Sequence, residues 1–146
     1  MDATTAIDIL NELLAWERGS LVARLAESGV FVSRPAVADL EALQSMARKT
    51  TEHVQWLSEA IMHLGGTPGF RFADASTGDL HYLELHHVLP RLISDREALI
   101  RKYTTASQRL AEEPAAASLV QRVLERHRES LATIRTAQHT QTAAPV

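Results

Sequence analysis

Apolar residues recur at intervals of three, four and seven along four stretches of the chain, which is the spacing of one face of an α-helix. The first stretch predicts a helix over 4–27 that ends before Gly29. The second predicts a helix from Pro35 to Leu64, because the glycine-rich run 65–69 stops it there. A helix of about 30 residues is about 45 Å long, a length typical of helical bundles.

The second half of the chain predicts two further helices. The third covers 79–110 and contains Pro90, which is expected to kink or interrupt it. The fourth covers 114–138, with a proline in its first turn. Residues 139–146 are expected to form a flexible tail.

The connection over 65–78 is rich in Gly, Asp, Ser and Thr and is longer than most helix–helix loops, which take about 2–8 residues. Such a connection is long enough to pass from one end of a bundle to the other. We therefore expect an all-α fold: a four-helix bundle over residues 1–138 in which two antiparallel helix pairs are joined by a long crossover.

Composition excludes several classes of protein. The chain has no Cys, which excludes disulfide scaffolds, Cys-type zinc sites and iron–sulfur clusters. Its formal net charge is −3, so electrostatics offers no reason to expect nucleic acid as a partner. It shows no signal-peptide pattern and no apolar run near the 18–20 residues of a membrane span. We expect a cytoplasmic protein with no membrane partner.

One ionisable residue falls on the apolar stripe of each predicted helix, near its middle. These residues are Glu17, His53, Arg96 and His127. A buried charge is costly unless it is paired or bound to metal. Taken singly, each residue has an ordinary interpretation: a hydrogen-bonded core histidine, or an arginine whose head reaches water. Taken together, they predict a common polar cluster in the bundle interior.

Several of these segments resemble the bacterioferritin-type members of the ferritin-like superfamily. The segment from His53 to Pro68, HVQWLSEAIMHLGGTP, resembles the family's second helix from its ligand histidine to a Leu-Gly-Gly-x-Pro stop. The segment Leu10–Glu17 is similar to the first helix, whose Glu is an iron ligand. Tyr103 and the segment His127–Leu131 also fit, so the resemblance covers roughly residues 7–135.

The resemblance implies a ferritin-like fold and a di-iron site built from four carboxylates and two Glu-x-x-His pairs. Carboxylate oxygens bridge and neutralise two iron ions, and two imidazoles complete the coordination. Glu17, His53 and His127 match ligand positions and are the candidate remnant metal ligands.

The other carboxylate positions have changed. Thr50, Arg96 and Leu124 stand where the family has glutamates, so three of the four carboxylates are missing. Arg96 is expected to form an ion pair with Glu17 and to supply part of the positive charge that metal would bring. Thr51 stands where the family's haem-ligand methionine lies, which argues against haem.

These substitutions lead to two main hypotheses. The first is a ferritin-like protein that has lost the di-iron ferroxidase centre, and with it enzyme activity, and serves as a structural or interaction module. The alternative is an iron-binding or iron-storage protein with a reduced site, helped by Asp95 or Glu97. A small-ligand binder that uses the bundle interior is a weaker third. In each case we expect a homodimer or a higher homo-oligomer.

Other polar and aromatic residues are expected to lie outside the centre. Glu52 and Glu125 should point away from it, because a helix turns about 100° per residue. Trp16 and Trp56 are expected at the edge of the core or in a dimer contact. Four histidines are expected on solvated surfaces: His63, His81, His86 and His87.

Overall fold

The structure, a computed structural model, describes residues 1–23, 37–71 and 85–143. A short helical turn at 21–23 follows the first helix, and the described residues contain no strand. Four long helices make up the bundle: α1 (Ala3–Arg18), α3 (Val37–His63), α4 (Leu85–Arg109) and α5 (Pro114–Ala143). The all-α class expected from the sequence is confirmed.

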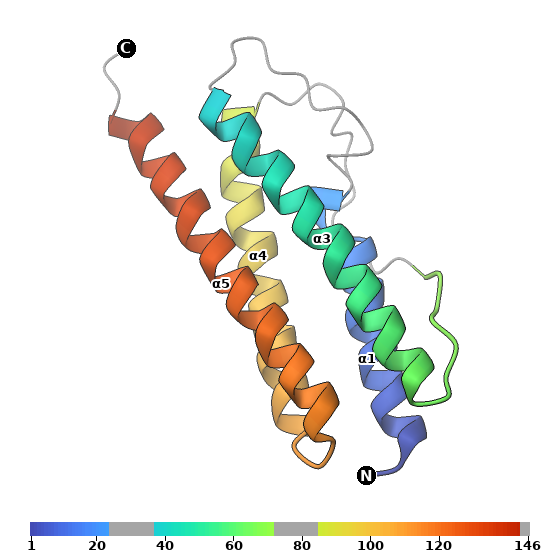
Figure 1. Cartoon of the computed structure of the whole chain (residues 1–146). Helices are drawn as coiled ribbons and strands as arrows, with labels where there is room; N and C mark the ends of the chain where they lie inside the picture. Colours follow the sequence, from blue (N-terminus) through green and yellow to red (C-terminus); the bar gives the residue numbers. More distant parts are fainter. Residues whose placement is uncertain (24–36, 72–84, 144–146) are drawn as a thin grey trace.

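The helices form two antiparallel pairs, α1 with α3 and α4 with α5 (Figure 1). Helices α1 and α5 begin at one end of the bundle, and α3 and α4 begin at the other (Figure 1). Because α3 and α4 run in the same direction, the chain between them must travel back along the bundle. The long crossover predicted from the sequence is therefore confirmed.

The end of α3 and the start of the crossover are held against α1. Gly65 adopts φ +88°, a left-handed conformation that favours glycine and ends the helix. A Cβ on Gly66 would lie 2.8 Å from the side chain of Ile7, so only glycine fits there without a shift. The Asn11 carboxamide accepts a 2.8 Å hydrogen bond from the Gly69 N–H. These contacts explain the Gly-Gly stop in physical terms.

The bundle interior consists of two apolar clusters. The larger apolar cluster lies toward the end where α1 begins: Ala6, Ile9, Leu10, Leu13, Leu14, Leu57, Ile61, Leu99, Tyr103, Ala106, Leu110, Ala116, Val120, Val123 and Leu124. The smaller apolar cluster lies toward the other end: Leu21, Val22, Leu43, Met46, Leu89, Leu92 and Ile134. Between the two clusters, each helix contributes one buried ionisable residue. We call these four the polar layer: Glu17, His53, Arg96 and His127.

The prediction of one continuous first helix is wrong. Helix α1 ends at Arg18, and Gly19 caps it. The Ser20 hydroxyl then accepts a 3.3 Å hydrogen bond from the backbone N–H three residues on, which starts a new helical turn. The Leu21 N–H donates to the Asp95 carboxylate at 3.3 Å. Apolar spacing continues across this break, so periodicity alone does not reveal it.

Two further helix predictions can be compared with the structure. Of the kink or interruption predicted at Pro90, the interruption does not occur, because Pro90 lies inside α4. Helix α5 continues to Ala143 rather than ending at Gln138, because no Gly or Pro occurs before Pro145. The predicted starts of the second and third helices lie outside the described residues.

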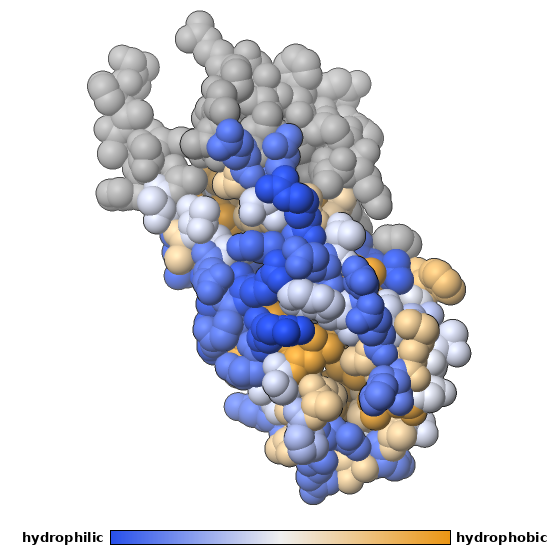
Figure 2. Space-filling view, viewed as in Figure 1, coloured by the Kyte–Doolittle hydropathy of each residue, from blue (hydrophilic) through white to orange (hydrophobic). Residues whose placement is uncertain are grey.

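Within the described ranges, no helix is both long and apolar enough to span a membrane. On the face formed by α3 and α5, mostly hydrophilic residues surround a hydrophobic patch between the two helices (Figure 2). A groove of about 350 Å³ lies there, with Trp56, Leu64 and Leu119 among its lining residues.

Candidate functional site

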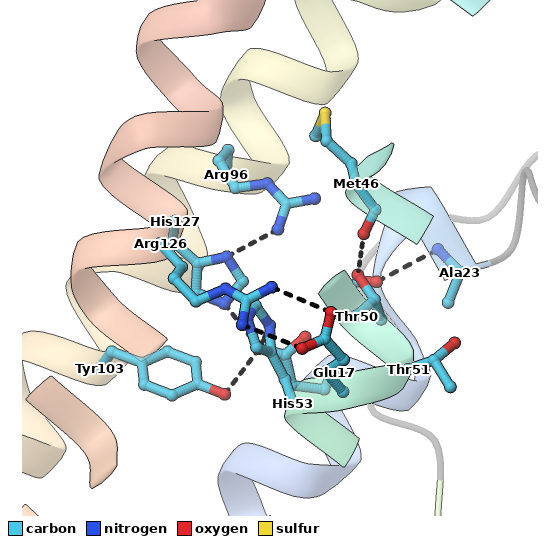
Figure 3. Close-up of polar contacts among 12 residues, drawn as sticks. Glu17, Ala23, Met46, Thr50, Thr51, His53, Arg96, Tyr103, Arg126 and His127 are labelled. Carbon is cyan, nitrogen blue, oxygen red and sulfur yellow. Dashed lines mark hydrogen bonds and ion pairs between the residues drawn. The ribbon is translucent and has the colours of Figure 1, made fainter. Parts of the chain in front are cut away.

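Each helix contributes one side chain to the polar layer: Glu17 from α1, His53 from α3, Arg96 from α4 and His127 from α5. None of the four is more than 2% exposed. They meet in the middle of the bundle, between helices that are otherwise packed through apolar residues (Figure 3). The sequence prediction that one ionisable residue per helix points inward is confirmed.

The contacts form a chain that runs across the bundle. Arg96 Nη1 lies 2.7 Å from Nδ1 of His127. On the other side of the same ring, Nε2 lies 2.6 Å from Oε1 of Glu17. Tyr103 donates its hydroxyl proton to that same oxygen at 2.7 Å (Figure 3). His53 Nδ1 lies 3.3 Å from Glu17 Oε1 but without the alignment of a hydrogen bond.

These contacts define the protonation of His127. A guanidinium has only donors, so Arg96 must donate and Nδ1 must accept. The single proton of the neutral ring then lies on Nε2, which donates to the Glu17 carboxylate. His127 is therefore a neutral ring that hydrogen-bonds to both Arg96 and Glu17, which do not contact each other directly.

The pKa shifts follow from burial and from these contacts. Burial lowers the pKa of His127 below its ordinary 6.5, and the nearby Arg96 charge acts in the same direction. Burial alone would raise the pKa of Glu17, but the contacts with His127 and His53 outweigh it and hold that pKa well below the ordinary 4.5. Burial and the Glu17 charge raise the pKa of Tyr103 well above 10.0, which keeps its hydroxyl a donor.

The layer also retains unused hydrogen-bonding capacity. Among the described residues, five atoms of the layer are buried without a hydrogen-bond partner: Glu17 Oε2, His53 Nδ1 and Nε2, and Arg96 Nε and Nη2. Buried polar atoms are ordinarily paired with protein or internal water. These groups lie toward the α1–α3 side and around the guanidinium, whereas His127 uses both of its ring nitrogens.

The direct ion pair predicted between Arg96 and Glu17 is not what the structure contains. The guanidinium binds His127, and Glu17 receives its hydrogen bonds from His127 and Tyr103. The reason is geometric: α4 packs most extensively on α5, so the Arg96 side chain meets the α5 histidine first. The two charges interact through the ring and over a longer distance.

Sequence reasoning named Tyr103 and Thr50 but did not predict the contacts that they make. The Tyr103 hydroxyl is a hydrogen-bond donor to Glu17. A buried Tyr hydroxyl usually needs a partner, and that rule was the available signal. Thr50 is only 4% exposed and donates its hydroxyl proton to the Met46 carbonyl at 2.9 Å, within its own helix. It therefore presents no ligand in place of a carboxylate.

Residues expected to lie away from the centre do so where the structure describes them. Glu52 pairs with Arg126 at 3.3 Å, and Glu125 pairs with Arg128 on the surface.

Asp95 and Glu97, the carboxylates considered as helpers of a reduced iron site, do not belong to the Glu17–His53–His127 group. Asp95 accepts a hydrogen bond from the Leu21 N–H, and Glu97 lies 3.5 Å from Arg135 in a partly exposed ion pair.

The two tryptophans lie at the edge of the larger apolar cluster, as expected. Lys102 lies 3.9 Å above Trp16, and Arg122 lies 4.4 Å above Trp56. His63 is exposed, as predicted. His81 and the side chains of His86 and His87 lie outside the described residues.

Three residues of the layer have the chemistry of a metal site. Glu17, His53 and His127 each offer a ligand atom, and the three atoms lie within 4.8 Å of one another. Two imidazoles and one carboxylate suit a divalent transition metal. The described residues contain no other such group of three. The layer therefore combines a possible ligand set with a buried guanidinium.

Comparison with known proteins identifies the fold. No protein-family model and no curated protein matches the sequence. A solved ferritin-like, diiron-carboxylate protein from Bacillus anthracis matches with a TM-score of 0.78 at 18% identity, covering 94% of this chain and 98% of that one. A dodecameric thioferritin, a bacterioferritin-related protein from Bacteroides fragilis, matches with a TM-score of 0.77 at 15% identity, covering 99% and 94%. The chain therefore shares the ferritin-like helical fold of these two proteins.

Proposed function

We propose that this chain is a ferritin-like protein that has lost the di-iron ferroxidase centre and serves as a structural or interaction module. The observation that carries the proposal is the contact between Arg96 and Nδ1 of His127. A histidine that binds metal through one ring nitrogen ordinarily donates the other N–H to a carboxylate, carbonyl or water. Here Nδ1 of His127 faces Arg96, which is itself a donor. The ring therefore cannot donate from Nδ1, as a metal-bound histidine ordinarily would.

The remaining residues do not fit a pair of iron ions. Thr50, Arg96 and Leu124 replace the three carboxylates that the family resemblance implies. Thr50 bonds within its own helix, and Leu124 belongs to the larger apolar cluster. Two divalent ions would face one carboxylate and a buried guanidinium, an arrangement with excess positive charge. On this proposal the protein has no ferroxidase activity.

The alternative is an iron-binding protein with a reduced site. The proximity of the ligand atoms of Glu17, His53 and His127 favours it. On this alternative, the guanidinium moves away from His127 when a single ion binds. Asp95 and Glu97 would need rearrangement to contribute, because both already have other contacts.

Assembly and location form part of the proposal. We expect a homodimer or a higher homo-oligomer, and the relative described as a dodecameric thioferritin supports self-assembly. We also expect a cytoplasmic protein with neither nucleic-acid nor membrane partners. We expect no haem, because Thr51 stands at the position of the family's methionine ligand.

Ferrous iron uptake separates the proposal from its alternative. The purified protein is mixed with Fe(II) without oxygen and then exposed to air, and bound metal and ferric absorbance are measured. The double variant Glu17→Gln with His53→Ala is the control for iron bound elsewhere. The proposal expects no difference between the two proteins. Stoichiometric iron in the wild type alone, with rapid oxidation, would establish the ferritin alternative.

A further inference from the structure

We propose that Arg96 closes a latent site for one divalent metal ion, formed by Glu17, His53 and His127. The inference rests on the proposed loss of the di-iron centre and goes a step further. It assigns the exclusion of metal to one residue rather than to the missing carboxylates alone. Three ligand atoms from three helices already lie within 4.8 Å of one another.

The ligand set is sufficient for one ion. Two imidazole nitrogens and one carboxylate oxygen make up known catalytic zinc sites and the open sites of non-haem Fe(II) proteins. Glu17 Oε2 and both ring nitrogens of His53 have no hydrogen-bond partner among the described residues. Two of the three ligands would therefore bind metal without giving up a hydrogen bond at those atoms.

His127 is the exception, and Arg96 is the reason. To bind metal through Nε2, the neutral ring must carry its proton on Nδ1. Arg96 lies 2.7 Å from Nδ1 and can only donate, so it holds the proton on Nε2. The guanidinium also places a buried positive charge, 1% exposed, on the opposite side of the His127 ring from Glu17. Proton position and charge both act against metal binding.

The substitution Arg96→Gln should open the site. Glutamine removes the charge, and its carbonyl oxygen can accept a hydrogen bond from Nδ1–H, directly or through water. Arg96→Lys is the matched control, because an ammonium group also only donates and keeps the charge. The two variants shorten the side chain, so shape alone does not distinguish them.

The test measures Co(II) binding by visible absorbance and Zn(II) binding by equilibrium dialysis on the folded, full-length proteins. We expect the affinity of Arg96→Gln to exceed that of wild type and of Arg96→Lys by about 10- to 100-fold, the usual size of effects at the residues that orient a metal-bound histidine. Binding should approach one ion per chain. Adding His53→Ala to Arg96→Gln should remove it, which separates this site from other histidines.

The outcomes are distinguishable. If folded Arg96→Gln binds no more metal than wild type, or if Arg96→Lys binds as tightly, the inference is overturned while the proposed loss of the di-iron centre stands. If the wild-type protein itself binds one ion and His53→Ala loses it, the inference fails. The proposed function then fails as well, in favour of the iron-binding alternative.

A second measurement applies even if Arg96→Gln does not fold. The nitrogen-15 chemical shifts of His127 in the wild-type protein report which ring nitrogen carries the proton. We expect a neutral ring protonated on Nε2. A ring protonated on Nδ1, or on both nitrogens, would overturn the inference.

Discussion

The polar layer and the larger apolar cluster occupy the same helices, about one turn apart, but they are stabilised in different ways. The larger cluster is held by burial of apolar surface, which has no preferred direction and tolerates changes that conserve volume. The layer depends on a chain of donors and acceptors in which Arg96, His127 and Glu17 each need a particular partner. Equal burial therefore does not mean equal tolerance to substitution.

The difference also bears on the proposed loss of the di-iron centre. On that proposal, the layer must still balance the charge of its one carboxylate. Arg96 supplies the charge, and His127 and Tyr103 supply the hydrogen bonds that reach Glu17. We infer that the layer persists because removing one member is costly, whereas replacing all of them at once need not be.

The largest effect is expected from methionine substitutions in the two regions. Arg96→Met leaves the Glu17 charge buried without a counter-charge and should lower the free energy of unfolding by about 3–5 kcal/mol. Leu57→Met introduces the same side chain into the larger apolar cluster and should cost less than about 1.5 kcal/mol. Urea unfolding measures both. Equal losses would contradict the distinction between layer and cluster.

The double variant Glu17→Gln with Arg96→Met is the control for the charge argument. Because it removes the anion together with the cation, its cost should be below the sum of the two single costs by about 0.5–3 kcal/mol. An additive result would show that the two charges do not stabilise each other through His127.

A smaller effect is expected from Tyr103→Phe. The variant keeps the ring in the larger apolar cluster and removes the 2.7 Å hydrogen bond to the Glu17 carboxylate. We expect a loss of about 1.5–3 kcal/mol, the range for hydrogen bonds to charged groups. In a Glu17→Gln background the same change should cost about 0.5–1.5 kcal/mol. An unchanged cost in that background would mean that the carboxylate charge does not matter to the bond.

A gradual effect is expected from acid. Because the folded-state pKa of Glu17 lies well below 4.5, its stabilisation is present above the unfolded-state pKa and is lost as pH falls through the folded value. Burial lowers the pKa of His127 below 6.5 in the folded state, so His127 acts in the same direction from a higher pH. Urea unfolding between about pH 7 and pH 3 should show stability falling with pH. The fall below about pH 4.5 should be shallower in Glu17→Gln.

The smallest effect is expected on the surface. Glu52 is beside His53 in sequence, but it forms a half-exposed pair with Arg126 at 3.3 Å. Glu52→Gln should leave the urea midpoint of unfolding almost unchanged, and any difference should shrink at high salt. A loss as large as that of Arg96→Met would mean that Glu52 belongs to the polar layer.

Much of the fold was predictable because helix periodicity is a local property. The spacing of apolar residues predicted four helices, and the run at 65–69 predicted the end of α3. The break after Arg18 was not predictable in this way. The helical turn after the break contacts a distant part of the chain: the Leu21 N–H donates a hydrogen bond to Asp95, which is 74 residues further along. The spacing of apolar residues within one helix does not indicate which contacts that helix makes with another.

The sequence by itself determined which residues enter the centre, because Glu17, His53, Arg96 and His127 lie on apolar stripes that must face inward. Only the tertiary structure decided which of them touch: Arg96 binds His127 rather than Glu17, and Tyr103 joins them. The reason is physical. An apolar stripe defines the direction in which a side chain points. A hydrogen bond also requires that the donor and acceptor atoms of two packed helices be placed to within a few tenths of an ångström.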